Sequence, residues 1–261
     1  MRKKAVFLDI DGTIWDGKNY IPPSTIKAIH RMQELGHVVF INSGRARSFI
    51  RERNLLDIGF DGIVSGCGTL IEYHGKEIFY YQVPREQAIE TVETVRHYGM
   101  RPILEGRHHL YMDYSEFHYE PYGQKVIDEM GEDLYSIADC WGEWEISKLS
   151  CATDDADMEG CKGALGKWYQ FMIHSSTVCE MVPLGFDKGT GIRKVCELLD
   201  VDISDTYAFG DSINDTEMIE AAGHAIVMGN GTDELKAKAE FVTTSLHDDG
   251  IFNGCRKMGL L

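Results

Sequence analysis

Residues 6–13, with the sequence VFLDIDGT, constrain the fold more than any other stretch of the chain. This apolar run is too short for a helix and ends at a turn glycine, so it predicts a strand buried on both faces, as in a parallel sheet. Alternate side chains of a strand point the same way, so Asp9 and Asp11 aim at one point beyond its carboxyl end. Two crowded carboxylates repel each other, so the pair predicts a bound cation or a shared proton.

A second acidic cluster lies far along the chain and repeats this pattern. A predicted strand at 206–209 ends in carboxylates, Asp211 and Asp215, at a strand-to-helix turn. Another predicted strand, 38–41, ends in a hydroxyl, a glycine and a cation, and Lys188 begins a helix-like stretch. Open α/β sheets bind their ligands beyond the carboxyl ends of such strands.

In this order, the motifs resemble the four motifs of the haloacid dehalogenase (HAD) superfamily of aspartate-nucleophile phosphatases. The resemblance spans the whole chain and rests on Asp9-Ile10-Asp11-Gly12-Thr13, Ser43-Gly44-Arg45, Lys188, and Gly210-Asp211 with Asn214-Asp215. It implies Mg²⁺ as cofactor, held by Asp9, the main-chain carbonyl of Asp11, Asp211 and Asp215. Asp215 is expected to act through a bound water or on Lys188.

The expected chemistry divides phosphate ester hydrolysis into two steps. Asp9 attacks phosphorus and forms an aspartyl-phosphate, and Asp11 protonates the leaving alkoxide and then deprotonates the hydrolytic water. Negative charge on the phosphoryl group calls for donors, and the expected phosphate-binding residues are Gly12, Ser43, Gly44, Lys188 and Asn214. Asn214 is expected to orient Lys188 or a metal-bound water.

Strand and helix alternate at both ends of the chain, which predicts an α/β fold: a Rossmann-like core with a parallel sheet. Before the insertion, strands are expected at 5–9, 38–41 and 62–65, helices at 24–35 and 45–54, and a hairpin at 68–73 and 77–81. After the insertion, helices and strands are expected to alternate at 188–199, 206–209, 213–222, 224–228, 232–238, 241–243 and 250–258.

The stretch between Arg45 and Lys188 is far longer than a strand–helix–strand step requires. We therefore expect a core at 1–82 and 184–261 with an inserted α+β cap at 83–183. Cap helices are expected at 85–98, 118–130 and 154–168, and strands near 101–105, 109–112, 144–150 and 178–183. A cap at this place resembles the Cof-type (subclass IIB) phosphatases. One departure is Cys67, which stands where that pattern usually has asparagine; a buried unreactive thiol is the favoured interpretation.

Composition indicates which partners and which cellular compartment to expect. The formal net charge of −16 argues against nucleic acid and anionic membranes as partners. No apolar run approaches the roughly 20 residues that cross a bilayer. The seven cysteines are scattered without a C-x-x-C pair, which favours reduced thiols in a cytoplasm. The expected state is a monomer or weak homodimer.

The sequence therefore predicts a Mg²⁺-dependent phosphomonoesterase acting on sugar phosphates or similar small phosphorylated metabolites. A phosphomutase of the phosphomannomutase type and a non-catalytic phosphate-binding scaffold remain alternatives. The cap is expected to select the substrate, and the candidate contacts are Arg45, Glu105, His108, His109 and Tyr111. For Arg45 an ordinary surface position, and for the others a solvated cap edge, is an equal alternative.

Overall fold

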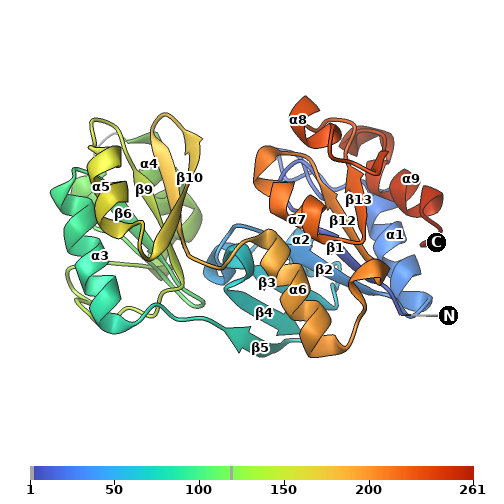
Figure 1. Ribbon diagram of the computed structural model, residues 1–261, viewed down its shortest axis with the longest axis horizontal. Coiled ribbons are helices and arrows are strands. Elements are labelled where there is room, and N and C mark those ends of the chain that lie inside the picture. Colours follow the sequence, from blue (N-terminus) through green and yellow to red (C-terminus); the bar gives the residue numbers. More distant parts are fainter. Residues whose placement is uncertain (1–2, 118–119) are drawn as a thin grey trace. The chain divides into compact units, whose positions relative to one another are not determined.

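The computed structural model describes residues 3–117 and 120–261, and the chain divides into two compact units (Figure 1). The core unit comprises Met1–Gly44, Arg51–Tyr80 and Asp187–Leu261. The cap unit comprises Arg45–Ile50 and Tyr81–Phe186. Among the described residues, no helix combines the length and apolar character needed to cross a membrane.

The core unit is built on an eight-stranded sheet in the order β14-β13-β12-β1-β2-β3-β4-β5. Neighbours from β14 to β3 are parallel, and β4 and β5 add an antiparallel hairpin. The strands are β1 Ala5–Leu8, β2 Val38–Asn42, β3 Gly62–Ser65, β4 Leu70–Tyr73, β5 Lys76–Tyr80, β12 Thr206–Gly210, β13 His224–Val227 and β14 Phe241–Val242. The parallel strands place their carboxyl ends at one edge, where the predicted site residues follow β1, β2 and β12.

Helices cover both faces of this sheet. The core helices are α1 Pro23–Glu34, α2 Arg53–Leu56, α6 Lys188–Leu199, α7 Thr216–Ala221, α8 Asp233–Lys236 and α9 Gly250–Lys257. Ala208 of β12 packs in a cluster with Ile192 of α6 and Met218 of α7. The next residue, Phe209, lies against Gly254 of α9, so α6 and α9 cover opposite faces.

The cap unit has a six-stranded sheet in the order β10-β11-β9-β6-β7-β8. Its strands are β6 Arg101–Glu105, β7 Leu110–Tyr111, β8 Leu134–Tyr135, β9 Lys148–Ala152, β10 Tyr169–Ser175 and β11 Val178–Pro183. Its helices are α3 Arg85–His97, α4 Pro121–Met130 and α5 Met158–Leu165. Leu104 packs in one apolar cluster with residues of α3 and α5, whereas Ile103 packs in another with residues of α4. The sheet is therefore covered on both faces.

One prediction of local structure is wrong, and tertiary contacts explain it. The helix expected at 45–54 is instead a 3₁₀ turn, Arg47–Phe49, followed by an extended stretch and the short α2. Ala46 and Ile50 are buried, and the Ser48 hydroxyl donates to the Gly106 carbonyl at 2.7 Å. These contacts hold Arg45–Ile50 in the cap unit, although it was assigned to the core. β8 and β10 were not expected from the sequence, and the first two residues of the helix expected at 118–130 lie outside the described part.

Candidate active site

Parallel pairing of β1 and β12 brings the two acidic clusters together. Leu8 lies opposite Phe209, and the amide of Asp9 donates to the Phe209 carbonyl at 3.1 Å. Asp9 directly follows β1 and Asp211 directly follows β12, so both side chains lie at the carboxyl edge of the sheet. This is the arrangement that the alternation of strands and helices predicts.

Lys188 connects two carboxylates from opposite ends of the chain. Its Nζ lies 2.6 Å from Oδ1 of Asp9 and 2.6 Å from Oδ1 of Asp215. All three side chains are almost entirely excluded from water. Of the two roles expected for Asp215, the structure contains the direct contact with Lys188.

The start of α6 sets the position of Lys188. A capping box begins the helix, in which the Asp187 carboxylate accepts from the Thr190 amide and the Thr190 hydroxyl accepts from the Asp187 amide. The Asn42 side chain, at the end of β2, donates to the Lys188 carbonyl at 2.9 Å. Gly189 is required here because a Cβ would lie 2.2 Å from the Glu217 carbonyl oxygen. Lys188 is therefore fixed through its backbone as well as its ammonium group.

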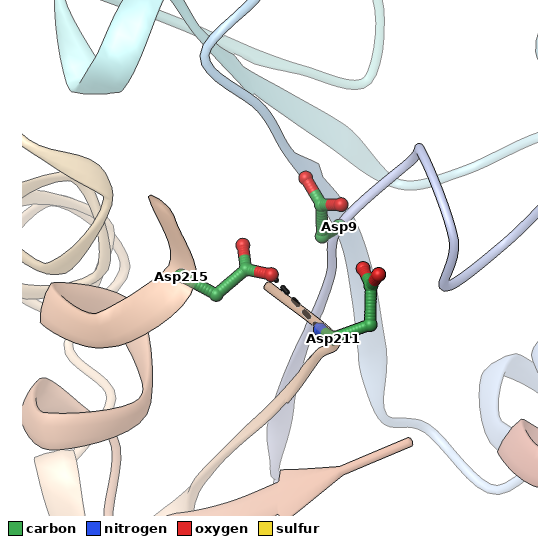
Figure 2. A group of neighbouring side chains, drawn as sticks. All are labelled: Asp9, Asp211 and Asp215. Atoms are coloured by element: carbon green, nitrogen blue, oxygen red, sulfur yellow. Dashed lines mark hydrogen bonds between the residues drawn. The ribbon is translucent and has the colours of Figure 1, made fainter. Parts of the chain in front are cut away.

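Asp211 and Asp215 are held by hydrogen bonds within their own loop. Oδ2 of Asp215 accepts from the amides of Asp211 at 2.9 Å and Ser212 at 3.1 Å. Thr13 donates its hydroxyl to Oδ1 of Asp211 at 3.1 Å, which links this loop to the first motif. Figure 2 shows the carboxylates of Asp9, Asp211 and Asp215 grouped at the ends of their elements.

Two glycines allow the acidic groups to pack this closely. A Cβ on Gly12 would lie 2.2 Å from Oδ2 of Asp211, and one on Gly210 would lie 2.7 Å from the carboxylate of Asp215. Gly12 also has a φ of +85°, which side chains rarely adopt. Any larger residue at either position would displace an aspartate.

The buried carboxylates resist ionisation. Burial, reinforced by the charge of Asp215, raises the pKa of Asp9 to about 8 despite the nearby ammonium of Lys188. Burial and Asp215 likewise raise the pKa of Asp211 to about 6. Burial alone would lower the pKa of Lys188, but the charges of Asp215 and Asp9 outweigh it and hold that pKa above its usual value.

The donor set fits a hard divalent cation. One carboxylate oxygen from each of Asp9, Asp211 and Asp215 lies within 4.8 Å of the others. A single lysine does not neutralise three carboxylates, and oxygen ligands of this kind suit Mg²⁺. The excess negative charge and the raised pKa values both indicate a place that a cation would stabilise. The side chain of Asp11 is not in this group, and its main-chain role stays a prediction.

Asp11 lies outside the buried cluster with its side chain exposed. Its Oδ1 accepts a hydrogen bond at 3.0 Å from the indole nitrogen of Trp15, which is completely buried. An exposed carboxylate close in sequence to the buried carboxylate of Asp9 is suited to exchanging protons with a substrate or with water. Nothing in the sequence analysis singled out Trp15.

The predicted phosphate donors lie after two different strands. Gly12 follows β1 and is close to Asp211, whereas buried Ser43 and its neighbour Gly44 follow β2. The side-chain oxygen of Asn214 accepts from the Ser212 hydroxyl at 2.6 Å. Its expected part in orienting Lys188 or a metal-bound water stays a prediction.

Cys67 is buried and lies between two glycines in a run of left-handed residues. Its φ is +56°, and its amide donates to the Ser43 carbonyl at 3.1 Å. Asparagine tolerates this backbone conformation better than most residues, which gives a physical reason for the usual asparagine. Burial agrees with the interpretation as an unreactive thiol.

The residues expected to contact the substrate in the cap unit lie in different surroundings, and their role stays a prediction. Glu105 is 4% exposed and lies 3.2 Å from Nζ of Lys148 in a buried ion cluster, so it is not a free cap-edge acid. Tyr111 is buried in the apolar cluster of α3 and α5. His108 is exposed, His109 lies against the Tyr135 ring at 4.3 Å, and Arg45 lies over the Phe49 ring.

Two further asparagines shape the site and were missed. Asn42 supports Lys188 as described above, and Asn230 donates to the Gly12 carbonyl at 2.8 Å while accepting from the Leu246 amide. Asn42 stands directly before the second motif, so its position was a usable signal. Asn230 lies between two glycines far from any motif, and only the fold brings it to Gly12.

Comparison with known proteins agrees with this geometry. The family model of haloacid dehalogenase-like hydrolases matches residues 6–254. YkrA of Bacillus subtilis (strain 168) is 34% identical over 279 residues, covering all of both chains. The 5-amino-6-(5-phospho-D-ribitylamino)uracil phosphatase YwtE of the same organism is 28% identical, covering 95% of each chain. The solved structure of the HAD subclass IIB sugar phosphatase BT4131 has a TM-score of 0.80 and 22% identity, covering 99% of this chain and 100% of that one.

Phosphatases of this superfamily generally use a divalent metal, and the three grouped aspartates provide a place for one. The family match extends over nearly the whole length, and one relative of equal extent exceeds 30% identity. The chain therefore belongs to the haloacid dehalogenase-like hydrolases of the Cof type, and is a phosphatase of small phosphorylated substrates.

Proposed function

We propose that the chain is a Mg²⁺-dependent phosphomonoesterase that forms an aspartyl-phosphate on Asp9 and acts on sugar phosphates or similar small metabolites. One observation carries this proposal: Asp9 shares Lys188 with Asp215, while its carboxylate also lies within 4.8 Å of Asp211. A nucleophile in this setting has a cation and metal-binding carboxylates beside it. The same arrangement would be costly in a protein without a charged ligand.

Asp9, Asp211 and Asp215 would hold the metal, together with the carbonyl of Asp11. Bound Mg²⁺ would offset the repulsion between the carboxylates and a phosphate dianion. Lys188 contacts Oδ1 of Asp9, so we expect the second oxygen, Oδ2, to attack phosphorus. In the first step, the bond between this oxygen and phosphorus forms as the ester bond breaks, and Asp11 gives its proton to the leaving oxygen.

In the second step, water replaces Asp9 on phosphorus. Asp11, now ionised, takes a proton from the water as its oxygen bonds to phosphorus and the bond to Asp9 breaks. Lys188 balances the charge that returns to Asp9. The two roles of Asp11 require contact with solvent and substrate, which its exposed side chain allows.

The substrate class is proposed on two grounds. YwtE is named for a substrate with a phosphoribityl group, and BT4131 is described as a sugar phosphatase. His108, His109 and Arg45 of the cap unit supply polar groups that suit a hydroxyl-rich leaving group. We propose these three, rather than Glu105 and Tyr111, as the candidates for substrate contact.

Phosphate release from a defined panel tests the proposal. The panel contains hexose and pentose phosphates, nucleotides, pyridoxal phosphate, flavin mononucleotide and p-nitrophenyl phosphate, assayed with Mg²⁺ and with chelator. Asp9→Asn is the control because it removes the nucleophilic charge with little change of shape. We expect Mg²⁺-dependent release that is fastest with sugar phosphates and lost in the variant.

The other outcomes distinguish the alternatives. Isomerised sugar phosphate without free phosphate would indicate a phosphomutase. Binding of phosphate without turnover of any ester, by folded protein with Mg²⁺ present, would indicate a scaffold. Release that persists in Asp9→Asn would contradict the covalent mechanism.

A further inference from the structure

Trp15 is attached to the loop of the first motif through both its backbone and its side chain. Its amide donates to the Ile10 carbonyl at 3.1 Å, and its carbonyl accepts from the Gly12 amide at 2.8 Å. Its indole nitrogen donates to Oδ1 of Asp11 at 3.0 Å. The ring is completely buried, whereas the side chain of Asp11 is exposed. A rigid donor therefore holds one oxygen of a solvent-accessible carboxylate.

The chemistry of the indole decides what this bond can do. An indole N–H donates and never accepts, so Oδ1 of Asp11 must be the acceptor. When the carboxyl group is protonated, its carbonyl oxygen is the better acceptor, so the indole favours Oδ1 as the carbonyl and Oδ2 as the oxygen that carries the proton. When the group is ionised, the same bond stabilises the charge. Both protonation states thus keep one orientation of the carboxyl group.

We propose that Trp15 is a positioning residue that makes Oδ2 of Asp11 the oxygen that exchanges the proton in both steps. This inference rests on the proposed function, because it assigns an atom to the acid–base role given to Asp11 there. In the first step the proton leaves Oδ2 for the leaving oxygen as the ester bond breaks. In the second step Oδ2 receives a proton from the water that displaces Asp9. Loss of the indole bond would allow the wrong oxygen to face the substrate for part of the time.

The test removes the indole donor and keeps the ring. Trp15→Phe deletes the N–H, and replacement of Trp15 by β-(3-benzothienyl)alanine keeps the bicyclic shape with sulfur in place of N–H. Trp144→Phe is the matched control. Trp144 is 4% exposed and donates its indole nitrogen to the Ile137 carbonyl at 3.1 Å, within the cap unit. Thermal unfolding of each variant verifies that the protein is folded.

Two substrates separate positioning from general damage. With the alkyl phosphate of the panel that is turned over fastest, both Trp15 variants should lose about tenfold in kcat with KM little changed, a part of the roughly 10²–10⁴-fold that acid–base help supplies. With p-nitrophenyl phosphate the leaving group needs no acid, so the burst of p-nitrophenol should keep its rate. Hydrolysis of the phosphoenzyme should slow, so that aspartyl-phosphate accumulates. Trp144→Phe should match the wild type.

Several results would overturn the inference. Wild-type kcat in the benzothienyl variant would show that the N–H is not needed. Equal slowing of the burst and of phosphoenzyme hydrolysis would show loss of structure rather than of orientation. Asp11→Asn, assayed in parallel, separates failure of this inference from failure of the proposed function. If Asp11→Asn is slow while the Trp15 variants are normal, only the role of Trp15 is wrong. Full activity of Asp11→Asn would instead contradict the proposed function.

Discussion

The ammonium group of Lys188 lies 2.6 Å from Oδ1 of Asp215, and both side chains are buried. Asp9 lies at the same distance from this ammonium, so one cation serves two carboxylates. Removal of one charge from a buried ion pair leaves its partner buried and uncompensated. The resulting loss of folding free energy exceeds the net stabilisation that the intact pair provides.

Lys188→Met should abolish turnover and lower the free energy of unfolding by about 3 kcal/mol at pH 8. Lys194→Met is the control, because Lys194 pairs with Glu197 on the exposed side of the same helix and its loss should cost less than about 1 kcal/mol. Urea unfolding and phosphate release measure the two effects. Equal destabilisation by both variants would show that burial of the pair is unimportant.

Asp9→Asn should reduce turnover on the order of 10⁴-fold or more without loss of the fold. Its stability relative to the wild type should increase with pH in metal-free buffer. Burial and the charge of Asp215 raise the folded pKa of Asp9 to about 8, above that of the unfolded chain. The protonated Asp9 stabilises the folded wild type in acid, and this contribution to the free energy of unfolding is lost as the pH rises through 8. Asparagine has no proton to lose, so the variant does not share this loss. Unfolding at pH 6 and pH 9 tests this, and a pH-independent difference would contradict it.

Binding of Mg²⁺ should release protons. With pKa values raised to about 8 for Asp9 and about 6 for Asp211, both by burial first and by Asp215 second, the free site holds protons near neutrality. The cation needs ionised carboxylates. Between pH 6 and pH 8 its Kd should therefore fall about tenfold per pH unit if binding releases one proton, and faster if it releases two. Titration calorimetry in two buffers of different ionisation enthalpy counts the protons. A Kd that is the same at pH 6 and pH 8 would refute the raised pKa values.

His37 should destabilise the protein in mild acid. Neither of its buried ring nitrogens has a hydrogen-bond partner among the described residues, and burial, with help from the charge of Lys4, lowers its pKa. The unfolded chain binds a proton near pH 6.5 and the folded chain resists it, so stability present above that pH is lost below it. The wild type should lose unfolding free energy between pH 7.5 and pH 5.5, and His37→Asn should make this loss smaller. An unchanged difference would exclude His37 as its cause.

Glu105 should matter for stability rather than for substrate binding. Lys148 lies 3.2 Å from Glu105 and 3.0 Å from Glu180, and it is almost completely buried. Lys148→Met should cost about 3 kcal/mol, and Glu105→Gln should leave KM within twofold of the wild type. Lys167→Met, which breaks an exposed pair with Glu90, should cost less than about 1 kcal/mol. A large rise of KM in Glu105→Gln would restore Glu105 as a substrate contact.

The sequence was most informative where local pattern and tertiary structure agree. Apolar runs that end in Asp9 and Asp211 predicted buried parallel strands, and parallel strands bring their ends to one edge. The hairpin turn predicted at His74-Gly75 is confirmed, because both residues have positive φ, of 48° and 71°.

Prediction failed where the deciding contact joins residues far apart in the chain. Nothing near Glu105 indicates that it pairs with Lys148, so it looked like a surface acid. The pattern of 45–54 predicted a helix, but a 3₁₀ turn forms there. Ala46 and Ile50 are buried, and Ala46 packs in an apolar cluster of the cap unit.

The segment Arg45–Ile50 has a practical consequence for protein engineering. A chimera that exchanges only 81–186 with a relative would leave behind Ala46, which completes an apolar cluster of the cap, and Ser48, which holds the Gly106 carbonyl. The foreign cap would then meet residues 45–50 of this chain, whose contacts are matched to a different cluster and a different carbonyl. Exchange of the whole cap unit of this chain therefore needs two grafts rather than one, and the smaller graft begins at Arg45, directly after the glycine of the second motif.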